Sequence, residues 1–71
     1  MNEYEILLTW DEEAQVWIAE NSEMSLVLES ESLDLLMKRV RLAAPEMLEA
    51  NGKNHKDVYL NFVANHIEAV A

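Results

Sequence analysis

The chain has 71 residues, 51% of them hydrophobic, and its 14 acidic residues against five basic ones give a formal net charge of −9 at pH 7. This acidity disfavours direct binding to DNA or RNA, because it repels a phosphate backbone. The absence of cysteine excludes a disulfide framework and a thiolate zinc site, and small scaffolds that lack both often gain stability by oligomerising.

The length predicts a single domain over residues 1–71, which buries only about 60% of the surface that its unfolded chain exposes. The apolar residues are dispersed in short runs, none of which has the length of a membrane span. Residues 1–5 are acidic and lack the basic region and apolar core of a secretory signal. A cytoplasmic location is therefore expected.

A first strand is predicted over residues 4–10, where apolar side chains alternate along one face: Tyr4, Ile6, Leu8 and Trp10. Three consecutive acids at 11–13 interrupt it, and β-branched and aromatic character resumes over residues 15–19. The two segments together predict a hairpin.

The register of this hairpin stays open at the level of sequence. A two-residue connection puts Trp17 on the side of Leu8, whereas a three-residue connection puts Ile18 there. In the first case Leu7, Val16 and Ile18 face away from the helix, and in the second Trp17 and Leu7 do. Either register leaves large apolar groups on the second face.

A turn at residues 21–23 precedes a third predicted strand over residues 24–29, with Met24, Leu26 and Leu28 on one side. After this strand the apolar residues recur at the spacing of a helix, and Ser32 is the expected N-cap. The apolar stripe of this helix consists of Leu33, Leu36, Met37, Val40, Ala44, Met47 and Leu48.

Pro45 is expected to kink the helix or to restart it, because proline cannot donate to the backbone ladder. Gly52 fits the C-terminal cap after Asn51.

The apolar residues of the segment 58–67 fit the spacing of a strand and also that of a helix. We favour a strand through about Ala64, because the segment is rich in residues of high strand propensity. Strand and helix both remain open for residues 65–71.

The predicted fold class is α+β: a three-stranded antiparallel meander, one helix and a fourth strand, forming one sheet with the helix on one face. One helix covers one face only, so the apolar groups on the other face predict a homodimer. The candidates for that interface are Leu7, Trp17, Tyr59 and Val63. The acidic turn of Asp11, Glu12 and Glu13 is the candidate for meeting a basic partner.

No catalytic or metal site is predicted. The run at 11–13 lacks the spaced ligands and glycine of a calcium loop. His55 and His66 have no cysteine or suitably spaced histidine to complete a zinc site. Gly52 is the single glycine, so a phosphate loop is excluded. We expect no enzyme activity and no cofactor.

Two segments make the chain resemble the HicB-like fold family: residues 10–19 (WDEEAQVWIA) across the first hairpin, and residues 42–52 (LAAPEMLEANG) at the end of the helix. Proteins of HicB type are antitoxins whose small sheet-and-helix domain blocks a compact basic toxin that cleaves messenger RNA. Complete members add a C-terminal DNA-binding domain, which we do not expect in a chain that ends at Ala71. The Pro and Gly usual in the turn before the third strand are absent from residues 21–24.

The resemblance implies a non-catalytic protein-binding domain that acts as an antitoxin-like inhibitor of a small basic, mRNA-cleaving protein. The alternative is a stand-alone dimeric domain, structural or binding a small ligand, with no toxin partner. In both cases we expect no membrane association and no direct contact with nucleic acid.

Overall fold

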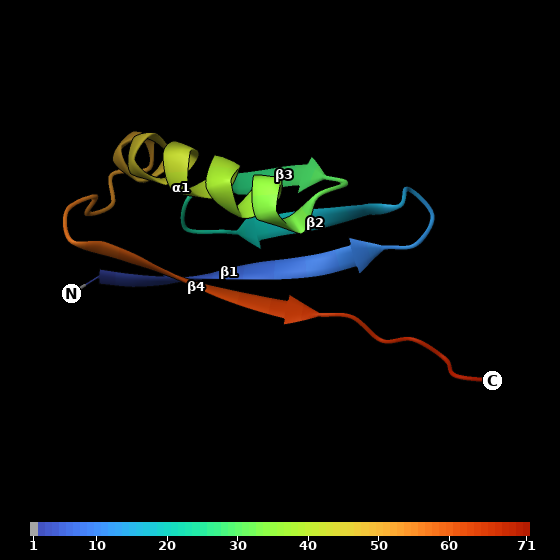
Figure 1. The fold of residues 1–71 in the computed structure, drawn as a ribbon. Coiled ribbons are helices and arrows are strands. Elements are labelled where there is room, and N and C mark those ends of the chain that lie inside the picture. Colours follow the sequence, from blue (N-terminus) through green and yellow to red (C-terminus); the bar gives the residue numbers. More distant parts are fainter. Residues whose placement is uncertain (1) are drawn as a thin grey trace.

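A four-stranded mixed sheet carries one helix on one of its faces in the computed structural model, which describes residues 2–71 (Figure 1). The sheet order is β3-β2-β1-β4, and the neighbouring pairs are antiparallel except for β1 and β4, which are parallel. The predicted class and element order are confirmed. In chain order the elements are β1 (Asn2–Asp11), β2 (Val16–Asn21), β3 (Leu26–Ser30), α1 (Leu33–Ala50) and β4 (Val58–Asn65).

The β1–β2 turn has four residues, 12–15, so neither of the two connection lengths considered from the sequence is correct. The side chain of Asp11 organises it, because Oδ1 accepts hydrogen bonds from the backbone N–H groups of Glu13 (3.1 Å) and Ala14 (3.2 Å). Gln15 closes the turn in the left-handed region at φ 57° and lies outside β2. A four-residue turn places each β2 side chain on the same side of the sheet as a two-residue turn would. Trp17 therefore lies opposite Trp10, on the side of Leu8.

The β2–β3 turn, residues 22–25, repeats this construction. Asn21 Oδ1 accepts the backbone N–H of Met24 at 3.0 Å, and Ser25 has φ 52°. The third strand therefore begins at Leu26 and not at Met24. The Met24 side chain is nonetheless fully buried, so the turn contributes to the core.

Helix α1 begins and ends as the sequence predicts. Ser32 Oγ accepts the backbone N–H of Leu35 at 3.2 Å, which satisfies a free donor of the first turn. The helix continues through Pro45 without restarting. At its end, the Gly52 N–H donates to the Glu49 carbonyl (3.0 Å) and the Lys53 N–H to the Leu48 carbonyl (2.9 Å), which is the Schellman arrangement.

Gly52 has φ 68°, a conformation that costs an L-residue energy because of its Cβ, although a Cβ built there meets no atom within 4 Å. Gly52→Ala is therefore expected to lower the free energy of unfolding by about 1 kcal/mol through backbone strain alone. Urea unfolding followed by circular dichroism measures this change. An unchanged midpoint would show that the helix end can relax away from the left-handed conformation.

The core lies between α1 and the face of the sheet that carries the alternating residues of β1. The helical stripe supplies Leu36, Val40, Ala44 and Leu48, all buried as expected. The remaining buried apolar residues are Tyr4, Ile6, Leu8, Ala19, Met24 and Leu26.

Residues 66–71 form neither helix nor strand, which answers the question that the sequence left open for the tail.

Candidate protein-binding surface

The sheet face opposite α1, here called the outer face, is covered by no other element of residues 2–71. It consists of the residues that alternate with the buried ones: Leu7 pairs with Val63 on β4 and with Glu20 on β2. Four of its large apolar side chains are exposed. The exposed fractions are 41% for Leu7, 69% for Val27, 55% for Tyr59 and 37% for Val63.

Leu7, Tyr59 and Val63 therefore share one exposed face, and their role in a dimer stays a prediction. Assigning Trp17 to the same face was wrong. The even-numbered turn directs Trp17 toward α1, where it is half-buried against the core. Val27 is the exposed apolar residue that the candidate set missed, although its alternation with Leu26 and Leu28 already placed it opposite them.

Four exposed glutamates lie on the outer face among these apolar groups. Glu3 and Glu5 alternate with the core residues of β1, Glu20 pairs with Val27, and Glu29 pairs with Ile18. None of the four strands described in residues 2–71 carries a lysine or arginine. The five cations lie on α1 or in the loop that follows it: Lys38, Arg39, Arg41, Lys53 and Lys56. The sheet thus carries acids and no bases, whereas α1 and the loop after it carry charges of both signs.

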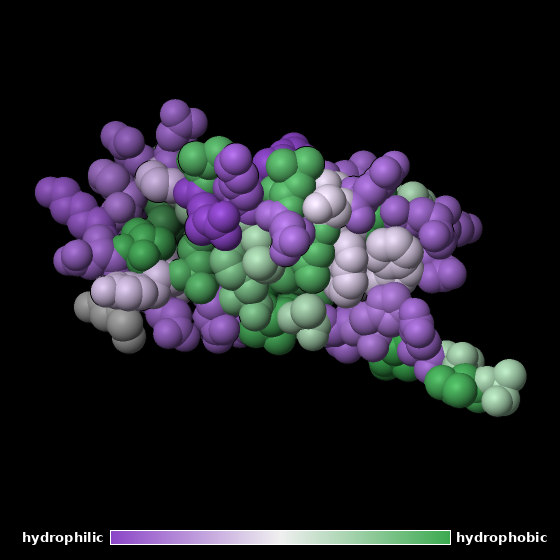
Figure 2. Space-filling model, in the orientation of Figure 1, coloured by the Kyte–Doolittle hydropathy of each residue, from purple (hydrophilic) through white to green (hydrophobic). Residues whose placement is uncertain are grey.

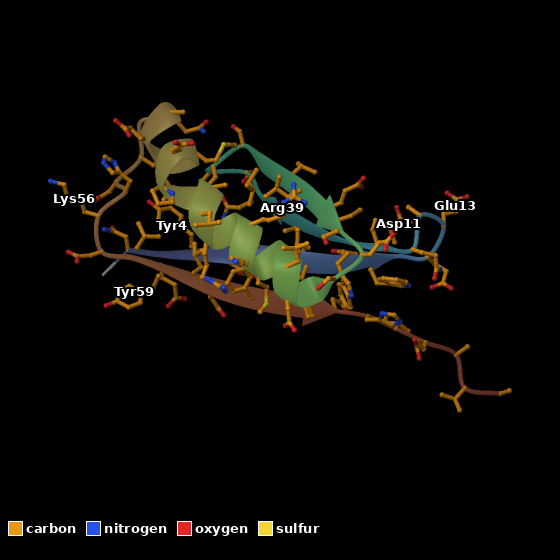
Figure 3. The ribbon with its side chains drawn as sticks, turned by 45° about the horizontal axis from the view of Figure 1, so that its top comes forward. Tyr4, Asp11, Glu13, Arg39, Lys56 and Tyr59 are labelled. Carbon is orange, nitrogen blue, oxygen red and sulfur yellow. The ribbon has the colours of Figure 1, made fainter. Side chains whose placement is uncertain are left out.

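The acidic turn projects from the far end of β1, away from Lys56 and Tyr59 (Figure 3). Its three carboxylates do different things. Asp11 holds the turn, as described above, and Glu12 Oε2 accepts the indole N–H of Trp10 at 2.6 Å. Glu13 is exposed, and no side-chain hydrogen bond or ion pair within residues 2–71 engages its carboxylate. Of the predicted partner-facing acids, Glu13 is the one whose carboxylate is available.

Three rings gather near this turn, where β1 and β4 end and β2 begins. The ring centroids of Trp10 and Trp17 are 5.6 Å apart in an edge-on arrangement, and His66 lies 5.8 Å from each of them. His66 Nε2 is 2.9 Å from Glu68 Oε1. An open cavity of about 560 Å³ lies beside Trp10 and His66. The three rings pack on each other.

No group of three or more His, Asp or Glu side chains within residues 2–71 is placed to hold a metal ion. The helix of the described chain is not long and apolar enough to cross a membrane. What the geometry offers is therefore a mixed apolar and acidic sheet face and an acidic turn.

These features define a class of small α+β domain: an antiparallel three-stranded meander, one helix, and a fourth strand parallel to the first, with one sheet face uncovered. Residues 3–71 match the family described as "Domain of unknown function (DUF1902)", and the chain belongs to this family. The crystal structure of the hypothetical protein TTHA1013 from the extremely thermophilic bacterium Thermus thermophilus is similar, with a TM-score of 0.82 and 30% sequence identity. That similarity covers 97% of this chain and 100% of the other. No curated protein matches the chain.

Proposed function

We propose that the chain is a non-catalytic protein-binding domain whose outer face and acidic turn bind a small basic protein. The observation that carries this proposal is the composition of the outer face: Leu7, Val27, Tyr59 and Val63 are surrounded by four exposed glutamates, and the strands that form the face have no cation. Protein interfaces commonly combine an apolar centre with polar groups around it.

The sign of the charge specifies the kind of partner. A surface with carboxylates of one sign steers an oppositely charged protein toward it and raises the association rate, an effect that salt weakens. Glu13 adds a further negative charge beyond the end of β1, and its carboxylate has no partner within residues 2–71. A basic protein that also presents apolar groups complements both properties of the face.

The resemblance of residues 10–19 and 42–52 to HicB-like proteins narrows this partner further. We propose an antitoxin-like role in which the basic partner is a small mRNA-cleaving toxin and the complex forms in the cytoplasm. Inhibition then requires no chemistry from this chain, only that it occupies the surface with which the toxin binds RNA.

The second candidate is a stand-alone dimeric domain, structural or binding a small ligand, with no toxin partner. The exposed apolar pair of Leu7 and Val63 favours it, because two such faces could bury each other. A face-to-face dimer would, however, bring Glu3, Glu5, Glu20 and Glu29 of both copies together without a cation. We therefore favour the basic partner for this face.

A charge reversal on the outer face tests the proposal. The double variant Glu5→Lys/Glu20→Lys is expected to weaken binding of a small basic protein, sought among the products of the neighbouring genes, by at least about tenfold, since it reverses two charges at the interface. The control Glu46→Lys/Glu49→Lys makes the same change of net charge on α1 and should leave affinity within about twofold. Isothermal titration calorimetry, with growth rescue on coexpression, gives the readout.

An equal loss of affinity in both double variants would contradict the assignment of the face, because net charge alone would explain it. If the neighbouring genes encode no short basic protein, or if the encoded protein does not bind in a pull-down, the antitoxin proposal fails. The stand-alone domain is then the remaining candidate.

A further inference from the structure

Strand β4 forms an unprotected edge of the sheet. Its eight residues, VYLNFVAN, include no charged residue and no proline. Its pairing with β1 runs without a bulge from Val58 opposite Asn2 to Asn65 opposite Thr9. One side of its backbone therefore presents unpaired N–H and C=O groups along a regular strand.

The opposite edge, β3, shows how this chain protects a strand. It has five residues and carries Glu29, whose side chain is exposed. Arg39 reaches across from α1 and its Nη1 donates to the Glu29 carbonyl at 2.9 Å (Figure 3). Soluble proteins shield edges with short strands, charges and bulges, and β4 has none of these devices.

Apolar side chains beside β4 are also incompletely covered. Leu60 and Phe62 point toward α1 but are only partly buried, since the helix packs mainly over β2 and β3. A groove of about 360 Å³ separates β4 from α1, and Arg41, Ala44 and Pro45 line its helical side. In Figure 2 apolar side chains gather below α1 in the middle of this side, with hydrophilic ones around them.

We propose that a second copy of this chain pairs its β4 antiparallel to this β4, which joins the two sheets into one of eight strands. Antiparallel pairing of identical strands has two-fold symmetry and closes the assembly at a dimer. Leu60 and Phe62 of each copy then cover the groove of the other, and the unpaired backbone groups become ladder hydrogen bonds.

Charge identifies the second copy as the occupant. Each chain carries a formal charge of −9, so two copies can approach closely only where carboxylates are absent. Strands β1, β2 and β3 all carry acids, and β4 is the strand of the described chain that has none. A basic partner would find no complementary charge at this edge. The outer face remains free in this dimer, so the inference does not depend on the proposed function.

The test places one carboxylate at the centre of the proposed interface. Asn61 is exposed, lies mid-strand and points to the outer face. In Asn61→Glu the two symmetry-related carboxylates would lie close together, which should raise the dimer dissociation constant at least about tenfold. The control Leu42→Glu makes the same change of net charge on an exposed position of α1, and Leu7→Glu makes it at the centre of the outer face. Both should stay within about twofold of the unsubstituted chain in sedimentation equilibrium.

A cross-linking experiment tests the same geometry without adding charge. The chain has no cysteine, so Asn61→Cys introduces a single thiol. A short bis-maleimide should link two native copies at this position but not in urea, and Val27→Cys on the opposite edge should not be linked. A monomer at about 100 μM, where even a weak interface is occupied, would overturn the proposal. So would dissociation by Leu7→Glu with Asn61→Glu still dimeric.

Discussion

Leu36→Ala is expected to lower the free energy of unfolding by about 3 kcal/mol. Leu36 is fully buried in α1, in the same cluster as Ile6 and Val40, so the truncation leaves a cavity as well as losing apolar contact. A domain of this length has a total stability of roughly 4–10 kcal/mol. The substitution therefore removes a large part of it, and the urea midpoint should fall accordingly at fixed protein concentration.

The neighbouring residue supplies a matched control. Leu35 is 49% exposed, so Leu35→Ala makes the same chemical change at an exposed position of the helix and should cost less than about 1 kcal/mol. If the two variants lost equal stability, the loss would not depend on how deeply the side chain is buried, since alanine favours the helix at both positions, and the assignment of Leu36 to the core would be contradicted.

Asn51→Asp is expected to cost about 2 kcal/mol. The Asn51 side-chain Nδ2 donates to the carbonyls of Met24 (3.0 Å) and Met47 (2.8 Å), which ties the end of α1 to the β2–β3 turn. Ser25 Oγ donates to Oδ1 at 2.9 Å. A carboxylate keeps the acceptor but loses both donors, and it places negative charge against two carbonyls at the negative end of the helix dipole.

Asn54→Asp is the control for this substitution. Asn54 uses its Oδ1 to accept the Lys56 N–H at 2.9 Å, and a carboxylate oxygen can accept that bond equally well. Its midpoint in thermal unfolding should stay close to that of the unsubstituted chain. Equal midpoints for the two aspartate variants would mean that the donors of Asn51 contribute nothing to stability.

The sequence predicted the first four elements because burial on one face imposes a regular spacing of apolar residues in each of them, whereas the last strand was predicted from strand propensity. It could not fix the hairpin register, since the facing of Trp17 depends on whether the turn has an odd or even number of residues. That number is set by the side chain of Asp11 bonding to the turn backbone, a local interaction that leaves no periodic signal. The pairing of β4 with β1 likewise leaves no periodic signal in the sequence.

The candidate surface was predicted in part. Leu7, Tyr59 and Val63 could be placed on the uncovered face because one helix covers one face, and alternation along β1 and β4 assigns them to the other. The gathering of four glutamates on this face was not foreseen. It depends on aligning Glu20 and Glu29 with the glutamates of β1, and that alignment follows from a register known only in three dimensions.

The parallel pairing of β1 with β4 determines when this chain can fold. Asn2 bonds to Asp57, and β1 pairs with residues up to Asn65, so the central strand of the sheet is completed by contacts between distant parts of the sequence. Such high contact order slows folding, because a long loop must close before the pairing is gained. During translation the meander and α1 emerge from the ribosome before β4. The native state therefore forms only after synthesis has passed Asn65, however early the hairpins appear.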